Sequence, residues 1–573
     1  MILLAVFCVL STIAPGQSAS APSSRAAEQV PAGGQSAAGT SGERGAIRGK
    51  VVDYNTGAAV VGAVVHLSGA VQRAAYTMEG GNFAFERLVP SQNYGLSADR
   101  LGYLDYSPSI LSSSSRIEIS PGQVRDDIVI RLVRGGVIGG QVLDESGEPV
   151  EGMPVHVGRL VFLEGRRQVA PVGFMQRLVT DDEGRFRVPN LRAGRYVVWA
   201  EPRDRQLTER VEGPVPAVYV KTYALGTTDV GSAMKIDLEP GARSLGANIS
   251  LARGRLVTLS GLVTTADGSS APGRRVILEE YIEGVDFVAT GGSAGYGLTD
   301  ANGRFVLRNI RPGTFSLTVE AARATDGTAA ALARTPVIVA DADITDLVLR
   351  EAVVTVKVRL VRESGEPSAG GREVSSVDLR PEGYGPPITA FGPSVDGHDL
   401  SASGEFVLRN VPAGKYRLHV QSRMMGLVRG VRQGAEDVTD SVIDLRSDVP
   451  ETELVVEVRS RPTLLEVVVS DAGGHAVEGS EVVVFSTTPE RWWLPESRYV
   501  GMLVSSQAGK FMTANMPPGD YFVAVATENL DDNLFGRTRE IDPEILERLR
   551  GSATVVSLAE DQTTKVSLRS PQP

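Results

Sequence analysis

The sequence predicts an all-β protein made of about five antiparallel β-sandwiches in tandem, with one short helix near its C-terminus. A motif that ends in two aromatic anchors about ten residues apart occurs five times along the 573 residues. Between these motifs, short runs of β-branched residues alternate with polar residues and are broken by Gly, Asn, Asp and Pro, as in strands joined by tight turns. Apolar residues at helical spacing are nearly absent. These three observations predict the fold class.

The aromatic anchors give the period of the repeat. Successive first anchors lie 103, 119, 101 and 105 residues apart. A period near 100 residues is that of a whole domain, whereas units that cannot fold alone are roughly 20 to 50 residues long. We therefore expect each pair of anchors to lie in its own core. The pairs are Phe83 and Tyr94, Phe186 and Tyr196, Phe305 and Phe315, Phe406 and Tyr416, and Phe511 and Tyr521.

Each repeat begins with a predicted strand, a turn and a second strand, as in residues 138–157, IGGQVLDESGEPVEGMPVHV. A second hairpin follows, in which Thr-Asp leads through a Gly to the first anchor, as from Thr180 to Gly184. Glycine suits the left-handed backbone that such a turn requires. An Asn step then reverses the chain so that both anchors face one core. The Asn residues are Asn190, Asn309, Asn410 and Asn515.

Each repeat closes with two further short strands around a polar turn, as in residues 117–119 and 128–132. The total is about seven strands per repeat, and the loop lengths predict that all of them are antiparallel. Such strands are typical of a β-sandwich.

One helix is predicted over residues 543–550. Asp542 can cap its first turn, Pro543 suits the first helical position, and Gly551 can end it. The apolar residues at helical spacing are Ile545, Leu546 and Leu549.

The repeats also predict the domain boundaries. Residues 1–21 contain an apolar run that is too short to span a bilayer and stands where a signal peptide belongs. Residues 22–45 are rich in Ser, Ala, Gly and Pro, which predicts a disordered linker. The predicted sandwiches span residues 46–134, 135–254, 255–351, 352–459 and 460–573, the last with the helix.

Composition limits the compartment and the partners. The one cysteine, Cys8, lies in the apolar run, so the mature chain can form no internal disulfide. The net charge is −11 without a basic run, which argues against nucleic acid as a partner. No later apolar stretch is long enough to span a membrane. We expect an exported protein that is periplasmic, at the cell surface or extracellular.

The order of the motifs, G-x-V-x-D, G-x-P-V-x-G-x-x-V, T-D-x-x-G-x-F and P-G-x-Y, resembles the carboxypeptidase regulatory-like domain. The second repeat carries most of it, from Gly140 and Asp144 through Thr180 to Tyr196. The resemblance implies a transthyretin-like sandwich, related to carbohydrate-binding-like sandwiches and common in exported bacterial proteins. It implies no peptidase activity, because the regulatory domain is not the catalytic one.

Three motifs that could carry chemistry have simpler explanations. His475 and Glu478 have the spacing of a zinc-binding pair, but the other histidines are scattered over other repeats, so a metal-dependent hydrolase is a remote alternative. Residues 291–295 fit G-x-S-x-G, but no helix follows to form a nucleophile elbow. The acidic turns at Asp181 and Asp300 could hold calcium, but turn formation explains them better. We predict no enzyme activity and no cofactor.

The most suggestive surface feature is a pair of adjacent tryptophans in the last repeat. Neighbouring residues of an extended segment face opposite ways, so both indoles cannot be buried in one core. One of them could stack on a sugar ring; alternatively, it could fill an interface beside the helix. The candidate ligand-binding residues are Glu490, Arg491, Trp492, Trp493, Arg498 and Tyr499.

The sequence therefore predicts a non-enzymatic, exported binding protein of elongated shape. A polysaccharide is the first candidate ligand. The alternative is a structural or adhesive spacer that binds an envelope protein, for which open sheet edges would suffice. The oligomeric state is not predicted.

Overall fold

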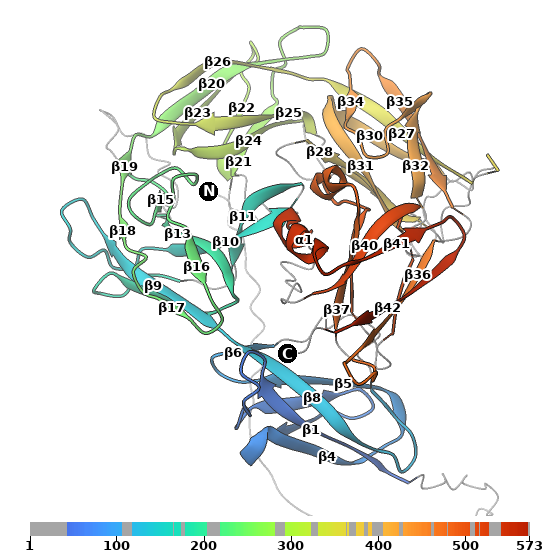
Figure 1. Ribbon diagram of the computed structural model, residues 1–573. Helices are drawn as coiled ribbons and strands as arrows, with labels where there is room; N and C mark the ends of the chain where they lie inside the picture. The colour runs from blue at the N-terminus through green and yellow to red at the C-terminus, as the bar shows by residue number, and fades with distance from the viewer. Residues whose placement is uncertain are drawn as a thin grey trace, which may run out of the picture.

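The structure is a computed structural model of the 573-residue chain. It describes residues 43–105, 117–163, 165–172, 178–202, 218–280, 293–321, 331–362, 364–365, 374–382, 388–391, 405–422, 428–459, 463–477, 480–504, 510–514, 516–526 and 540–570. The regular secondary structure of this part of the chain is mostly β-strand, with one α-helix and short 3-10 turns (Figure 1). The predicted signal peptide, most of the predicted linker, Cys8 and Glu478 lie outside the described residues.

Two sheets form the first sandwich, and its first and last strands lie in the same sheet. That first sheet consists of β1 (Gly45–Asp53), β4 (Asn82–Leu88), β6 (Tyr103–Asp105) and β8 (Val124–Arg134). The second sheet consists of β2 (Val64–Ser68), β3 (Arg73–Tyr76), β5 (Ser91–Asp99) and β7 (Ile117–Ile119). The short 3-10 turn η1 (Glu79–Gly81) precedes β4.

The second sandwich repeats this plan with shorter closing strands. Its first sheet consists of β9 (Gly136–Leu143), β12 (Arg185–Leu191), β17 (Arg243–Ser244) and β18 (Ile249–Ser250). Its second sheet consists of β10 (Val155–Leu163), β11 (Arg166–Val172), β13 (Gly194–Ala200), β15 (Thr222–Tyr223) and β16 (Ile236–Leu238). A separate ribbon pairs β14 (Val218–Tyr219) with β19 (Arg253–Gly254).

The third and fourth sandwiches follow. The third has β20 (Val257–Thr264), β23 (Arg304–Ile310) and β26 (Ile344–Arg350) in its first sheet, and β21 (Arg275–Glu280), β22 (Ser293–Leu298), β24 (Gly313–Glu320) and β25 (Ala331–Val339) in its second. The fourth has β27 (Val353–Arg362), β30 (Glu405–Pro412), β32 (Val428–Gln433), β33 (Glu436–Asp437) and β35 (Glu451–Val458) in its first sheet, and β28 (Val374–Pro381), β29 (Ile388–Phe391), β31 (Gly414–Ser422) and β34 (Ile443–Leu445) in its second.

The fifth sandwich carries the helix. Its first sheet consists of β36 (Leu464–Ser470), β39 (Lys510–Ala514) and β42 (Thr563–Arg569). Its second sheet consists of β37 (Glu481–Ser486), β38 (Val500–Val504), β40 (Gly519–Val525) and β41 (Thr554–Leu558). The 3-10 helix η3 (Pro489–Trp493) lies between β37 and β38, and α1 (Pro543–Arg550) precedes β41. Asp542 caps α1 by accepting from the Glu544 N–H, as predicted.

The all-β class and the tandem sandwiches are confirmed, but the expectation that every strand pair is antiparallel is wrong. In each sandwich the first strand pairs in parallel with a closing strand, as β1 does with β8. In each sandwich, the strand before the first of these closing strands lies in the second sheet, so the loop between them crosses from one sheet to the other. Because that loop joins strands that are not neighbours, its length does not set their relative direction.

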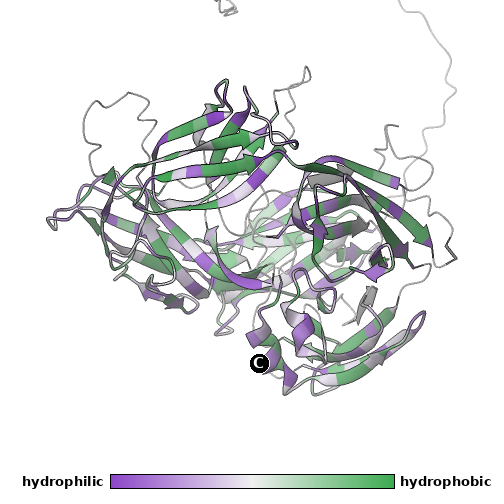
Figure 2. Ribbon diagram, turned by 90° about the horizontal axis from the view of Figure 1, so that it is seen from above, coloured by the Kyte–Doolittle hydropathy of each residue, from purple (hydrophilic) through white to green (hydrophobic). Residues whose placement is uncertain are grey.

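Hydrophobic residues alternate with hydrophilic ones along many of the strands (Figure 2), and each sandwich buries its own cluster of apolar side chains. Both anchors of each of the first four pairs lie in the cluster of their own sandwich, as predicted. Tyr521 lies in the fifth cluster, and the Phe511 side chain is outside the described residues. The exact domain boundaries stay predictions.

Recurrent polar residues tie each core to its turns. The buried anchor hydroxyls of Tyr196, Tyr416 and Tyr521 each donate to a backbone carbonyl four residues earlier, at 2.7 to 2.8 Å. The Asn step is left-handed, with φ of 58° at Asn190 and 55° at Asn410, which Asn tolerates better than most residues.

The second to fifth sandwiches are arranged around a common centre, and the first lies outside this ring (Figure 1). Neighbours in sequence are joined by short connections; only Gly135 separates β8 from β9, and two residues separate β26 from β27. The fifth sandwich returns to the second, where Arg167 of β11 pairs with Asp542 beside α1. The predicted elongated shape is therefore wrong for these four sandwiches, because the repeat motifs do not indicate how the chain turns between domains.

Candidate binding site at the tryptophan pair

The candidate residues lie in the connection between β37 and β38, which we call the tryptophan segment (residues 489–499). It begins as η3, with Pro489 at a position where its fixed φ suits a helical turn. The segment lies at the edge of the fifth sandwich and reaches both the fourth and the second sandwich, as its contacts below show.

Trp492 is a packing residue of the fifth sandwich. Only 3% of it is exposed, and it lies among Phe485, Leu546 and Leu549 beneath α1. Its indole N–H donates to the Ser486 carbonyl at 2.7 Å, so its one polar group is satisfied inside the protein. The ring meets Phe485 edge to face at 5.5 Å between centroids. This indole offers no face to a ligand.

Trp493 is the exposed member of the pair. It is 48% exposed, and its ring meets Phe162 of β10 at 5.4 Å between centroids and 77° between planes. Phe162 itself is buried. The adjacent indoles thus face different surroundings, as the sequence argument expected, and Trp493 covers part of a neighbouring sandwich.

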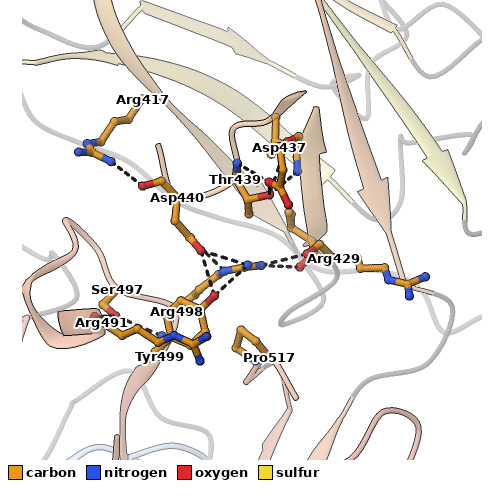
Figure 3. A network of polar contacts seen from close by, with 12 residues as sticks. Arg417, Arg429, Asp437, Thr439, Asp440, Arg491, Ser497, Arg498, Tyr499 and Pro517 are labelled. Atoms are coloured by element: carbon orange, nitrogen blue, oxygen red, sulfur yellow. Dashed lines mark hydrogen bonds and ion pairs between the residues drawn. The ribbon is translucent and has the colours of Figure 1, made fainter. Parts of the chain in front are cut away.

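Arg498 and Tyr499 join the fifth sandwich to the fourth (Figure 3). The Arg498 guanidinium contacts both carboxylate oxygens of Asp440, at 3.1 and 3.3 Å, and donates to the Arg429 carbonyl at 3.1 Å. The Tyr499 hydroxyl donates to the same Asp440 carboxylate at 3.0 Å. Arg417 donates to the Asp440 carbonyl at 3.0 Å from within the fourth sandwich. These two candidate residues therefore serve an interface between sandwiches.

Glu490 and Arg491, the two remaining candidates, differ in their surroundings. Glu490 is exposed, and no hydrogen bond or ion pair of its side chain is recorded among the described residues. Arg491 lies with its guanidinium 4.3 Å from the centre of the Tyr499 ring, a cation–π contact, and its carbonyl accepts from Ser497 at 2.6 Å. Only Glu490 and Trp493 of the six candidates are largely open to solvent.

Burial shifts the pKa of Tyr521, which lies beneath the tryptophan segment. Tyr521 lies in the core of the fifth sandwich, and burial raises the pKa of its phenol well above the ordinary value, because a charged phenolate would lose its hydration there. The nearby Arg491 and Arg498 oppose this rise but do not cancel it.

Glu496 is a contact residue that the sequence did not indicate. Its carboxylate pairs with Arg380 of β28 and lies 3.5 Å from Nε2 of His419 in β31. Its backbone N–H donates to the Glu540 carboxylate at 2.5 Å, and the same carboxylate accepts from Gly165 of the second sandwich at 3.0 Å. The backbone of Glu496 is left-handed, with φ 49°, and no sequence motif predicts this conformation.

A second aromatic cluster, on the outer face of the second sandwich, was also missed. Trp199 stacks on His156 at 5.4 Å, lies under the Lys221 ammonium at 4.9 Å, and donates to Glu201 at 3.2 Å. Its ring is buried, so these contacts pack the sheet face. The residues come from three strands and their flanks, which is why no sequence spacing showed them.

The other motifs lie in turns. His475 is 84% exposed at a hairpin, with its Nδ1 3.3 Å from Asp471. Asp181 and Asp300 each accept two backbone N–H bonds within their own turns. Ser293 begins β22, an edge strand that leads to another turn.

Within the described ranges, no group of three His, Cys, Asp or Glu side chains is placed to hold a metal ion. Over the same residues, no helix has the length and apolarity needed to cross a membrane.

A family model matches the first sandwich. The model of the carboxypeptidase regulatory-like domain covers residues 46–132, nearly the whole span from β1 to β8. The first sandwich is a carboxypeptidase regulatory-like domain. The four sandwiches that follow this regulatory-like domain share its plan of two sheets with a parallel pair of first and closing strands. No curated protein has a significantly matching sequence.

Several solved structures align with the chain at low similarity. A streptococcal ancillary pilin is 12% identical over 56% of this chain and 100% of its own, with a TM-score of 0.19. The minor pilin of Streptococcus agalactiae is 14% identical over 38% of this chain and 96% of its own, with a TM-score of 0.20. The major pilin of Bacillus cereus is 12% identical over 76% and 99%, with a TM-score of 0.14.

Proposed function

We propose that the chain is an exported, non-enzymatic binding protein, and that a saccharide binds at the exposed face of Trp493. Export is supported by the apolar run at residues 2–14 and by the resemblance to a domain common in exported bacterial proteins. The single observation that carries the ligand proposal is a half-exposed indole held in a fixed orientation by Phe162.

The surroundings of Trp493 suit such a ligand. A sugar ring has an apolar face and a rim of hydroxyls, so it needs a flat apolar surface with hydrogen-bonding groups beside it. Trp493 supplies the surface, and Glu490, three residues earlier in the sequence, is the exposed charged residue among the candidates. Because Phe162 already fixes the ring, little conformational entropy is lost when a ligand stacks on it. Trp492, Arg498 and Tyr499 are omitted from the proposed site because their contacts are internal.

Titration with a panel of polysaccharides tests the proposal. Binding should change the Trp fluorescence of the full chain. Because Trp493→Ala also removes the reporting indole, binding to this variant is measured by calorimetry and should be lost. Tyr296→Ala is the matched control, because Tyr296 is also an exposed aromatic residue (66%) but lies on β22 of the third sandwich. Equal binding by the Trp493→Ala and wild-type chains would refute the site, and no binding to any polysaccharide would refute the ligand class.

The second candidate is a scaffold that binds an envelope protein through an open sheet edge. It is favoured by β22, an edge strand with Tyr296 and Leu298 exposed on one face. An extended partner segment could add to such an edge by backbone hydrogen bonding. Leu298→Lys should then weaken binding to an envelope-protein fraction while Trp493→Ala leaves it unchanged; the opposite pattern would favour the saccharide site.

A further inference from the structure

Among the residues that the structure describes, a group of contacts closes the ring between segments about 375 positions apart in sequence. On one side stands the β10–β11 hairpin of the second sandwich, with Phe162, Gly165 and Arg167. On the other side stand Trp493 and the residues that lead into α1. We call this the closure contact. Its residues on the fifth sandwich are Trp493, Glu540, Asp542 and Glu544.

The closure contact is held largely by charge. Arg167 makes a two-pronged pair with Asp542, at 3.0 and 3.1 Å, and a third contact with Glu544 at 2.6 Å. The hydrogen bonds to Asp542, and then those to Glu544, raise the pKa of Arg167, so the guanidinium stays charged. Its side chain is 42% exposed, so water and salt reach the pairs and weaken them.

The closure contact also depends on a close approach between the backbones of the two sandwiches. Gly165 is left-handed, with φ 72°, and its N–H donates to Glu540 at 3.0 Å. A Cβ at this position would stand 2.4 Å from the Trp493 carbonyl oxygen, and that backbone atom cannot move aside alone. The two sandwiches can come this close only because residue 165 has no side chain.

The closure contact can hold because the other junctions of the ring bring the second and fifth sandwiches together. The second sandwich bonds to the third, where Arg311 donates to the Pro202 carbonyl at 2.6 Å. The third bonds to the fourth where the Ala352 N–H donates to the Leu332 carbonyl of β25 at 3.1 Å, and the Arg498 network joins the fourth to the fifth. Linked in this way, the halves meet at a high effective concentration, so even weak bonds keep them together.

We propose that the closure contact is a releasable latch, which opens the ring between the second and fifth sandwiches when its charge pairs or its glycine contact are lost. When the latch is closed, Phe162 is covered by Trp493; opening uncovers both rings on facing surfaces. This holds whether or not a saccharide binds to Trp493.

Two glycines of the second sandwich give a matched test. Gly165→Ala and Gly152→Ala impose a similar backbone cost, because the two residues have φ of 72° and 69°. A Cβ at Gly152 meets no atom within 4 Å, whereas one at Gly165 meets Trp493. Gly165→Ala should raise the hydrogen exchange of peptides that contain Phe162 about fivefold or more and increase the radius of gyration in solution scattering. Gly152→Ala should do neither.

Charge reversal tests the same latch independently of the backbone. Arg167→Glu should open the ring, and 1 M salt should do so in the wild-type chain, because its Debye length is only about 3 Å. Arg48→Glu is the control; it breaks an exposed pair with Glu86 inside the first sandwich, at 2.8 Å. Unchanged exchange in β20 and β27 would show that the variants are folded. If Gly165→Ala and Arg167→Glu, once shown to be folded, match their controls in exchange and scattering, the latch does not exist.

Discussion

At the scale of single residues, each core is fixed by a few polar side chains that recur with the repeat. The tyrosine anchors fill the core and also bond the turn before their strand, as Tyr196 does at 2.7 Å. The Asn step takes a left-handed backbone, and the Thr before the acidic turn bonds two backbone groups of the first hairpin. The burial of the anchors and the reversal at the Asn step could be predicted from sequence because each repeat carries their local geometry, whereas the bonds of the Tyr and Thr hydroxyls come from the structure.

Tyr521→Phe separates two contributions of the buried phenol. At neutral pH we expect the variant to lose about 1 kcal/mol in the fifth sandwich, because the bond from the hydroxyl to the Pro517 carbonyl at 2.7 Å is lost. Burial raises the pKa of Tyr521, so folding favours the neutral phenol. The contribution of the neutral phenol to the free energy of unfolding is complete below about pH 10 and falls as the pH rises toward the pKa of the folded state. Urea unfolding followed by exchange in β36 should therefore show the difference between the two proteins shrinking above pH 10. A constant difference would mean that the phenol titrates freely.

Thr180→Val tests the tie between the two hairpins of the second sandwich. The buried Thr180 hydroxyl accepts from the Met153 N–H at 2.9 Å and donates to the Val150 carbonyl at 2.6 Å. Valine keeps the shape but leaves a buried N–H unpaired, which should cost about 1–3 kcal/mol. Thr180→Ser keeps the hydroxyl and should cost less. A larger loss for Thr180→Ser than for Thr180→Val in a urea titration would show that the methyl group, rather than the hydroxyl, matters.

At the scale of elements, the sequence predicted the hairpins and the helix but not the direction of the closing strands. A hairpin is specified by its own turn, and α1 by its cap and its spacing of Leu546 and Leu549. The parallel pair of β1 and β8 depends on a crossing between sheets, which loop length alone does not indicate. The tryptophan segment shows the same limit, because contacts with α1 and with other sandwiches decide which of its side chains are covered.

The two tryptophans should differ sharply in their effect on stability. Trp492→Ala should cost about 3–5 kcal/mol, since it removes a buried ring from between β37 and α1. Trp493→Ala should cost about 1 kcal/mol or less, because half of its surface is already exposed. Thermal unfolding of both variants would check this, with exchange in α1 as the local measure. Similar costs would mean that the contact of Trp493 with Phe162 is as strong as a core contact.

At the scale of the whole molecule, four sandwiches close into a ring and the regulatory-like domain stands outside it (Figure 1). Sequence repeats give the number of domains but not the rotation between them, which arises from side chains such as Arg498 and Glu496 that have no counterpart in the motif. The arrangement of the ring is therefore the part of the structure that the sequence predicted least well.

Removal of the first sandwich tests its independence. A chain that begins at Gly135 should keep the ring, because the contacts described at this junction are backbone bonds of Gly102, Arg134, Gly135 and Gly241. Exchange in α1 and in the β10–β11 hairpin should match that of the full chain. Faster exchange at both places would show that the first sandwich supports the closure contact.

The parallel pairing of first and closing strands bears on mechanical strength. In the first sandwich, tension applied through residues 43 and 135 pulls β1 and β8 in opposite directions along their length, so the interstrand bonds are loaded in shear and must break together rather than one at a time. We expect a high rupture force for this sandwich when a single molecule is pulled from these two points, and a much lower one when β1 is peeled from its side. A protein anchored at one end and loaded at the other would thus resist extension without a single disulfide.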